Sequence, residues 1–266
     1  MSTNPLLNSL KLPGRVFQLP SKGIFYAPGI LADTSEHAEV QVKPLSALAE
    51  IKLRSPDMLF SGRALAEVCQ ECIPEILQPY ELLSKDIDAI FCFLRIVTYG
   101  AEMEIKSTHE CAGAKLTTHV VDIEQIVMNA NNLILDHALT LYTMTLSNEQ
   151  KLMLKPVTFK SAMHVMQLRR DVEQIMSAGG TSQELIEKTI IQDMLSIIES
   201  VEGITDVSMI EEWLRQLPKK YYKEITSYSK SANEWGFNLT AQLTCKECGE
   251  VYPHNLELDP INFFTG

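Results

Sequence analysis

The 266-residue chain contains no apolar run approaching the ~18 residues that a membrane-spanning helix needs, which argues against an integral membrane protein. Six cysteines are too few for a disulfide scaffold, and no charged-then-apolar leader opens the sequence, so we expect reduced thiols. Basic residues are also scarce, with 23 Lys and Arg against 34 Asp and Glu and a net charge of −11. Proteins that bind nucleic acid through its phosphates usually show the opposite balance, so nucleic acid is not the expected partner.

The sequence signatures of common enzyme classes are missing as well. There is no G-x-x-x-x-G-K-[ST] phosphate loop, no G-x-G-x-x-G after a predicted strand, no H-E-x-x-H and no G-x-S-x-G. The six histidines are scattered, and none lies at a recognisable spacing from a nucleophile. The sequence therefore predicts a protein that is not an enzyme.

The apolar pattern predicts an α+β fold that is mainly helical and carries two small antiparallel β-hairpins. Hydrophobic residues make up 45% of the chain, enough for an ordinary core. The hairpins are expected near residues 102–121 and 237–258, each after a helix that ends at an aromatic residue followed by glycine. We also expect a strand over 139–146 and a long helix that continues to about Val201.

One order of elements occurs twice along the chain, which indicates a weak internal repeat. The order is strand, Lys-Pro, helices, aromatic-Gly and a hairpin with cysteine at its turn. It divides the chain into an extended N-terminal arm (1–36), a first repeat half (37–128), a connector (129–149) and a second repeat half (150–266). Because a lone two-stranded hairpin is marginally stable in water, we expect the two hairpins to be neighbours in space.

The second hairpin carries the only signal with metal-ligand spacing. Cys245 and Cys248, two residues apart on a turn loosened by Gly249, can hold one edge of a Zn²⁺ tetrahedron. The repeat places Cys111 and His109 on the equivalent turn of the first hairpin, where they could supply the other two ligands. The hypothesis is a structural zinc held by these four side chains, and the alternative is a set of ordinary reduced thiols.

The arm carries two adjacent aromatic residues, Phe25 and Tyr26, in a segment (13–29) expected to lack regular structure. Side chains alternate along an extended backbone, so the two rings should face opposite sides. We expect one ring to enter the protein's own core and the other to serve a partner.

Several short motifs follow one another along nearly the whole chain, and their order is more specific than any one of them. Together with the two strand-Lys-Pro pairs, they resemble the baseplate hub and hub-assembly proteins of T-even-type contractile-tailed bacteriophages. That family usually shows a CxxC at both hairpins, whereas this chain has a single cysteine at the first. The motifs are Leu19–Tyr26, Leu94–Gly100, Trp213–Pro218, Cys245–Gly249 and Leu258–Phe264.

The resemblance implies a non-enzymatic hub subunit or hub-assembly protein that acts through contacts with other baseplate hub proteins. It brings no catalytic residues. It implies a location in the virion tail baseplate, in the host cytoplasm during assembly, or in both. A different class remains open at this point, a zinc-ribbon adaptor that binds nucleic acid or a polymerase, and the net charge favours the first interpretation.

Overall fold

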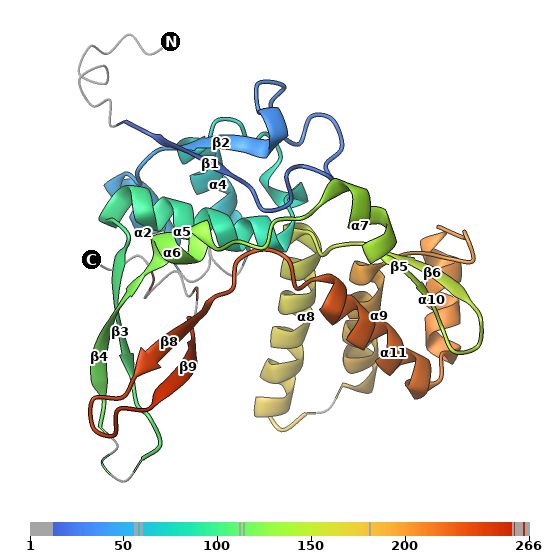
Figure 1. Cartoon of the computed structure of the whole chain (residues 1–266). Coiled ribbons are helices and arrows are strands. Elements are labelled where there is room, and N and C mark those ends of the chain that lie inside the picture. The colour runs from blue at the N-terminus through green and yellow to red at the C-terminus, as the bar shows by residue number, and fades with distance from the viewer. Residues whose placement is uncertain are drawn as a thin grey trace.

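The fold is organised around α5 (Ser84–Tyr99), which is labelled in Figure 1. This helix is apolar on nearly every face. The structure is a computed structural model and describes residues 13–55, 58, 61–111, 113, 115–180, 182–256, 258 and 263. Ile90, Phe93 and Leu94 of α5 are fully buried. A helix that is apolar on nearly every face must be covered by other elements. The residues that cover it come from both halves of the chain, among them Phe17, Phe159 and Phe237.

The N-terminal arm covers one face of α5 by forming a strand. β1 (Arg15–Gln18) pairs antiparallel with β2 (Glu39–Val42). Phe17 of β1 stacks on Phe93 with the ring centroids 4.3 Å apart. The expectation that the arm lacks regular structure is therefore wrong for β1, because pairing with β2 buries its aromatic side chain. Residues 1–12 lie outside the described part of the chain.

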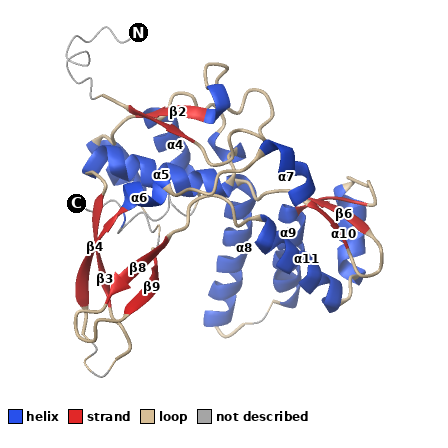
Figure 2. Cartoon of the chain, viewed as in Figure 1, coloured by secondary structure: helices blue, strands red, loops and turns tan. Residues whose placement is uncertain are grey.

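Two hairpins project from the helical layer as a stalk (Figures 1 and 2). The first is β3 (Glu102–Ser107) with β4 (Thr117–Asp122), and the second is β8 (Thr240–Thr244) with β9 (Val251–Asn255). Gly100, with φ at +92°, lets the chain turn sharply from α5 into β3. We call these four strands and their two turns the stalk.

The two hairpins are neighbours, as predicted. Their inward side chains share the core around α5, among them Met103, Val121, Ala241 and Leu243. Closer to the turns, the Tyr252 hydroxyl donates to Ser107 Oγ at 3.2 Å. Two otherwise marginal hairpins thus stabilise each other.

The second half forms a helical body with its own core beside the stalk. A three-stranded antiparallel sheet, in the order β5-β6-β7, packs among its helices. The prediction of only two hairpins is therefore incomplete, because the described residues form four small sheets. The body comprises α7 (Leu135–Leu141), β5 (Thr143–Thr145), β6 (Lys151–Leu154), α8 (Phe159–Ser177), α9 (Gln183–Ile197), β7 (Ile198–Val201), α10 (Val207–Gln216) and α11 (Lys219–Ala232).

Two local predictions in this half are wrong. The segment expected as a strand over 139–146 is the end of α7 followed by the short strand β5. The helix expected to reach Val201 ends at Ile197, where the chain becomes β7 and pairs with β6. In both places strand pairing decides the backbone conformation. The division into an arm, two repeat halves and a connector stays a prediction.

The remaining short elements complete the layer around α5. These elements are η1 (Glu36–Ala38), α2 (Ala47–Leu53), α4 (Arg63–Cys72), η2 (Pro79–Glu81) and α6 (Ile123–Met128).

None of the helices in the described part of the chain has both the length and the apolar character that a membrane span requires.

A buried carboxylate fixes the arm to the first turn of α5. Asp86 is fully buried and accepts hydrogen bonds from the Ser21 amide at 3.0 Å, from Ser21 Oγ at 2.5 Å and from the Tyr26 hydroxyl at 2.5 Å. The Tyr26 oxygen also accepts a bond from the Leu83 amide at 3.0 Å. Burial raises the pKa of Asp86 to about 6, and the Ser21 and Tyr26 donors oppose this rise.

We predict that Tyr26→Phe lowers the free energy of unfolding by about 1–3 kcal/mol, because a buried amide and a carboxylate each lose a partner. The folded pKa of Asp86 lies above the unfolded value, so its proton stabilises the fold below about pH 4 and this contribution is lost as the pH rises through about 6. The lost donor stabilises mainly the charged carboxylate. The cost should therefore be larger at pH 7.5 than at pH 5, measured by urea unfolding.

Tyr228→Phe is the matched control, because the Tyr228 hydroxyl donates to the exposed carbonyl of Thr143 at 2.8 Å. Its effect should stay within about 0.5 kcal/mol and should not depend on pH. An equal cost for Tyr26→Phe at the two pH values would contradict the assigned role of Asp86.

Candidate metal centre at the stalk tip

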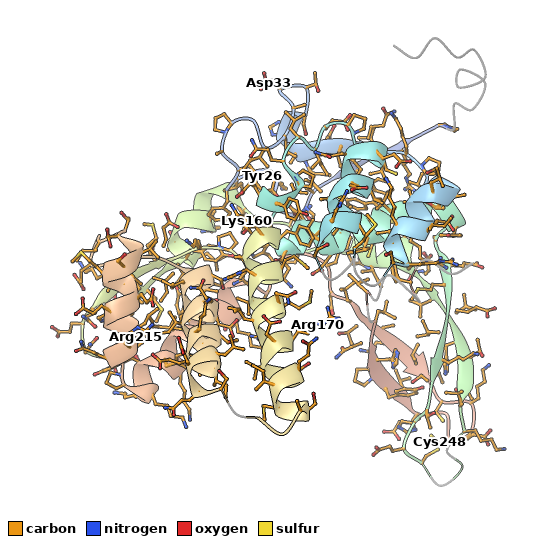
Figure 3. The ribbon with its side chains drawn as sticks, turned by 180° about the vertical axis from the view of Figure 1, so that it is seen from behind. Tyr26, Asp33, Lys160, Arg170, Arg215 and Cys248 are labelled. Atoms are coloured by element: carbon orange, nitrogen blue, oxygen red, sulfur yellow. The ribbon has the colours of Figure 1, made fainter. Side chains whose placement is uncertain are left out.

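The stalk brings four potential metal ligands together at its far end. His109, Cys111, Cys245 and Cys248 each present one ligand atom, and these atoms all lie within 4.8 Å of one another. We call these four residues the tip cluster. Figure 3 shows Cys248 at the end of the stalk, far from the helical body. Across the described residues, no other group of three or more His, Cys, Asp or Glu side chains converges in this way.

The second hairpin contributes its two cysteines from a tight turn. The Gly249 amide donates to the Cys245 carbonyl, and the Cys245 amide donates to the Glu250 carbonyl, both at 2.9 Å. Gly249 has φ at +75°, a conformation that glycine adopts without steric cost. The sequence Cys-x-x-Cys-Gly therefore forms this turn and directs both thiols to the same side.

The first hairpin contributes His109 and Cys111 from the loop between β3 and β4. The Cys111 amide donates to the His109 carbonyl at 2.9 Å, which tightens the loop. Two polar contacts hold this loop and β4 against the second hairpin: Lys115 Nζ lies 3.8 Å from Glu247 Oε1, and Lys246 Nζ donates to the Thr118 carbonyl at 3.0 Å.

Two of the distances between ligand atoms are close to those of a tetrahedral zinc site. Cys111 Sγ lies 3.9 Å from Cys245 Sγ, and Cys248 Sγ lies 3.5 Å from His109 Nδ1. Sulfur at ~2.3 Å and nitrogen at ~2.0 Å from a central Zn²⁺, at the corners of a tetrahedron, would lie about 3.5–3.8 Å apart. Three thiols and one imidazole are a donor set that zinc takes in closed structural sites.

The imidazole of His109 is oriented by residues outside the cluster. Its Nδ1 faces the Cys248 thiol, and its Nε2 lies 3.8 Å from Glu250 Oε2. The Tyr252 ring stacks on the imidazole, with centroids 4.6 Å apart and an interplanar angle of 25°. A carboxylate on the distal nitrogen is the usual way to fix a metal-binding imidazole. Sequence analysis missed Glu250 and Tyr252, because only the register of β9 brings them to His109.

The thiols of the tip and those of the core differ in their ionisation. Amide groups of Cys248 and Glu247 hydrogen-bond the Cys245 sulfur and lower its pKa to about 6. Burial raises the pKa of Cys72 to about 11 and that of Cys92 to about 12, and it raises the pKa of Cys69 further still. The core cysteines are therefore small apolar side chains, whereas Cys245 at the tip can supply a thiolate.

The two aromatic residues of the arm both pack against the protein itself. Tyr26 is held inward by its bonds to Asp86 and Leu83. Phe25 meets the Tyr142 ring edge-on at 5.2 Å and lines a cavity of about 290 Å³. Both residues are half-buried, and a partner role for either ring stays a hypothesis.

The fold and the tip cluster define an α+β protein whose helices carry a stalk of two hairpins joined at a Cys/His tip. Residues 40–265 match the family described as T4 bacteriophage base plate protein. The chain belongs to this family, and the phage resemblance drawn from the ordered motifs is confirmed. No curated protein and no solved structure matches the chain.

We predict that iodoacetamide separates five of the six cysteines, all except Cys245, into two classes after treatment with EDTA. Cys111 and Cys248 should react in the native protein, because both are accessible and Cys248 is exposed. The three core cysteines should react only after unfolding, since their thiols are buried and protonated at neutral pH. Mass spectrometry of tryptic peptides measures the modified fractions, and native modification of Cys92 would contradict the assignment.

Proposed function

We propose that this phage baseplate protein is a non-enzymatic hub subunit or hub-assembly protein that acts through contacts with other baseplate hub proteins. The observation that carries the proposal is the family match over 40–265, which spans both hairpins and the helices between them. The absence of enzyme signatures in the sequence supports a role in contacts rather than chemistry. We propose the virion tail baseplate as its location, with the host cytoplasm as its location during assembly.

The other class of protein, a zinc-ribbon adaptor for nucleic acid or a polymerase, gains no support from these observations. The matched family is a baseplate family, and the chain has a net charge of −11.

We further propose that the tip cluster holds one structural zinc ion. Cys111, Cys245, Cys248 and His109 would fill all four tetrahedral positions, leaving no open position for water or substrate. Such a closed site stabilises structure rather than performing catalysis. Its role here would be to join two hairpins that lie far apart in the sequence into one rigid stalk.

The zinc proposal predicts one tightly bound zinc per purified chain, measured by inductively coupled plasma mass spectrometry. Cys248→Ser should weaken zinc affinity at least about 100-fold, because a direct ligand matters more than the outer residues whose loss costs about 10–100-fold. Cys92→Ala, in the core, should retain one equivalent of zinc. Chelation of the wild type should open the loop at 108–116 to limited proteolysis, whereas retention of full zinc by Cys248→Ser would refute the site.

The hub proposal predicts that tails assembled in cells infected with phage lacking this chain have hubs that are missing or reduced. Purified baseplates would be compared by electron microscopy and by mass spectrometry of their subunits. A tagged copy of the chain should restore assembly and co-purify with other hub proteins. Normal yields of complete hubs without the chain would overturn the proposal, whatever the metal content of the stalk.

A further inference from the structure

A concavity lies in the helical body, at a distance from the tip cluster. A cavity of about 800 Å³ is bounded by α8, α9, α11 and the first turn of α5. Its apolar lining includes Val165, Met166, Met194, Ile197, Tyr222 and Trp235. This volume is in the range of binding pockets that take up apolar groups of a ligand.

Exposed apolar side chains continue the cavity along the α8–α9 pair. Met166 is 45% exposed on α8, and Ile190, also 45% exposed, and Ile186 follow at helical spacing on α9. Ile186, Ile190 and Ile197 share one face of α9 with Asp193, because residues three and four apart lie one above the other. Arg169 of α8 pairs with this Asp193 at 2.5 Å. Met166 lies three residues before Arg169 and Ile190 lies three residues before Asp193, so the helix faces that carry these two apolar side chains lie side by side. We call the cavity and this line of side chains the helical groove.

The charges of the groove oppose those of the whole chain. Lys85, Arg169 and Lys230 line the cavity together with a single carboxylate, Asp193, whereas the protein as a whole has a net charge of −11. Asp193 is already paired with Arg169, Lys85 is attracted electrostatically to Asp88, and Lys230 forms no ion pair with a described residue. Ser84 Oγ also lines the cavity, and it is buried without a hydrogen-bond partner among the described residues. The side chains of Lys85 and Lys230 and the hydroxyls of Ser84 and Tyr222 line the cavity without a hydrogen bond to a described residue, a set that suits a carboxylate.

We infer that the helical groove binds an acidic amphipathic helix of another baseplate protein. Two packed helices present a groove into which the ridges of a third helix fit, with anchors at i, i+3 or i+4 and i+7. The apolar floor would take up the anchors, and Lys85 and Lys230 would pair with Asp or Glu of the same segment. A nucleic acid fits the groove less well, because its phosphates would meet the Asp193 carboxylate and its other contacts would be with an apolar floor. A lipid also fits less well, because it would leave the apolar side chains along α8 and α9 uncovered. The inference rests on the proposed function, since it names the kind of hub segment that the protein binds.

The test begins with a photo-crosslinker, p-benzoylphenylalanine, incorporated at position 166 of the full chain during phage infection. Met166 is exposed enough for the replacement to preserve the fold, which circular dichroism and thermal melting would verify. The matched control is position 128, because Met128 is 79% exposed on α6, outside the groove. We expect a cross-link from position 166, and not from 128, to a segment of another baseplate protein with apolar residues at helical spacing and at least one acidic residue.

A labelled synthetic copy of the captured segment then measures affinity by fluorescence anisotropy. Lys230→Glu should weaken binding about tenfold or more, because it turns an attraction into a repulsion at the groove. Lys219→Glu changes an exposed lysine of the same helix that does not line the cavity, and its effect should stay within about twofold.

The inference is overturned if position 166 gives no cross-link, if it reacts no more than position 128, or if it captures nucleic acid, lipid or a segment without acidic residues. Equal effects of the two lysine variants would overturn it as well. If hub proteins still co-purify with the chain, these results refute the inference that the groove binds a helix, and the proposed function is not affected. If no hub protein co-purifies, the proposed function itself fails.

Discussion

The need to cover α5 on every side determines how the rest of the chain is arranged. A fully buried helix gains its stability from packing rather than from propensity, so each neighbouring element must supply a complementary apolar face. β1 does this with Phe17, and the chain just before β8 does it with Phe237, whose ring meets Phe93 edge-on at 5.7 Å. The same helix also buries Asp86, and a buried carboxylate is tolerated only with donors around it. The arm is therefore as much a part of the core as α5 itself.

The parts that the sequence predicted are those in which local pattern and tertiary packing agree. In the strand at 102–107, exposed and less exposed residues alternate as its polar and apolar residues do, and Cys245-x-x-Cys248-Gly249 forms the tight turn expected of it. The internal repeat also allowed a contact across 134 positions, between Cys111 and Cys245, to be predicted without any local signal linking them. Repetition of element order carried long-range information that composition and periodicity lack.

The remaining features depend on contacts with segments that are distant in the sequence, and short-range sequence patterns do not reveal these contacts. Ile198–Val201 is apolar enough to continue α9, and it becomes a strand because β6 offers free backbone groups beside it. Glu250 and Tyr252 reach His109 only through the register of β9, and the alternation of that strand does not reveal which ring its tyrosine will meet. The helical groove is still less visible from sequence, since it arises where three amphipathic helices meet without filling the space between them.

The stalk has different means of cohesion at its two ends. At its base, apolar residues of both hairpins belong to the α5 core, so the strands there are held by burial. At its tip the contacts are polar, and Cys248 is exposed, so little apolar area is available to hold the turns together. A covalent link that closes a loop of ~100 residues lowers the entropy of the unfolded chain and thereby adds roughly 4–5 kcal/mol to the free energy of unfolding. A strained or looser link adds less. A metal bound by the tip cluster would close a loop longer than this, and it would act where the apolar core no longer reaches. With a metal bound, the tip cluster would hold the two hairpins together at the end of the stalk that the apolar core does not reach.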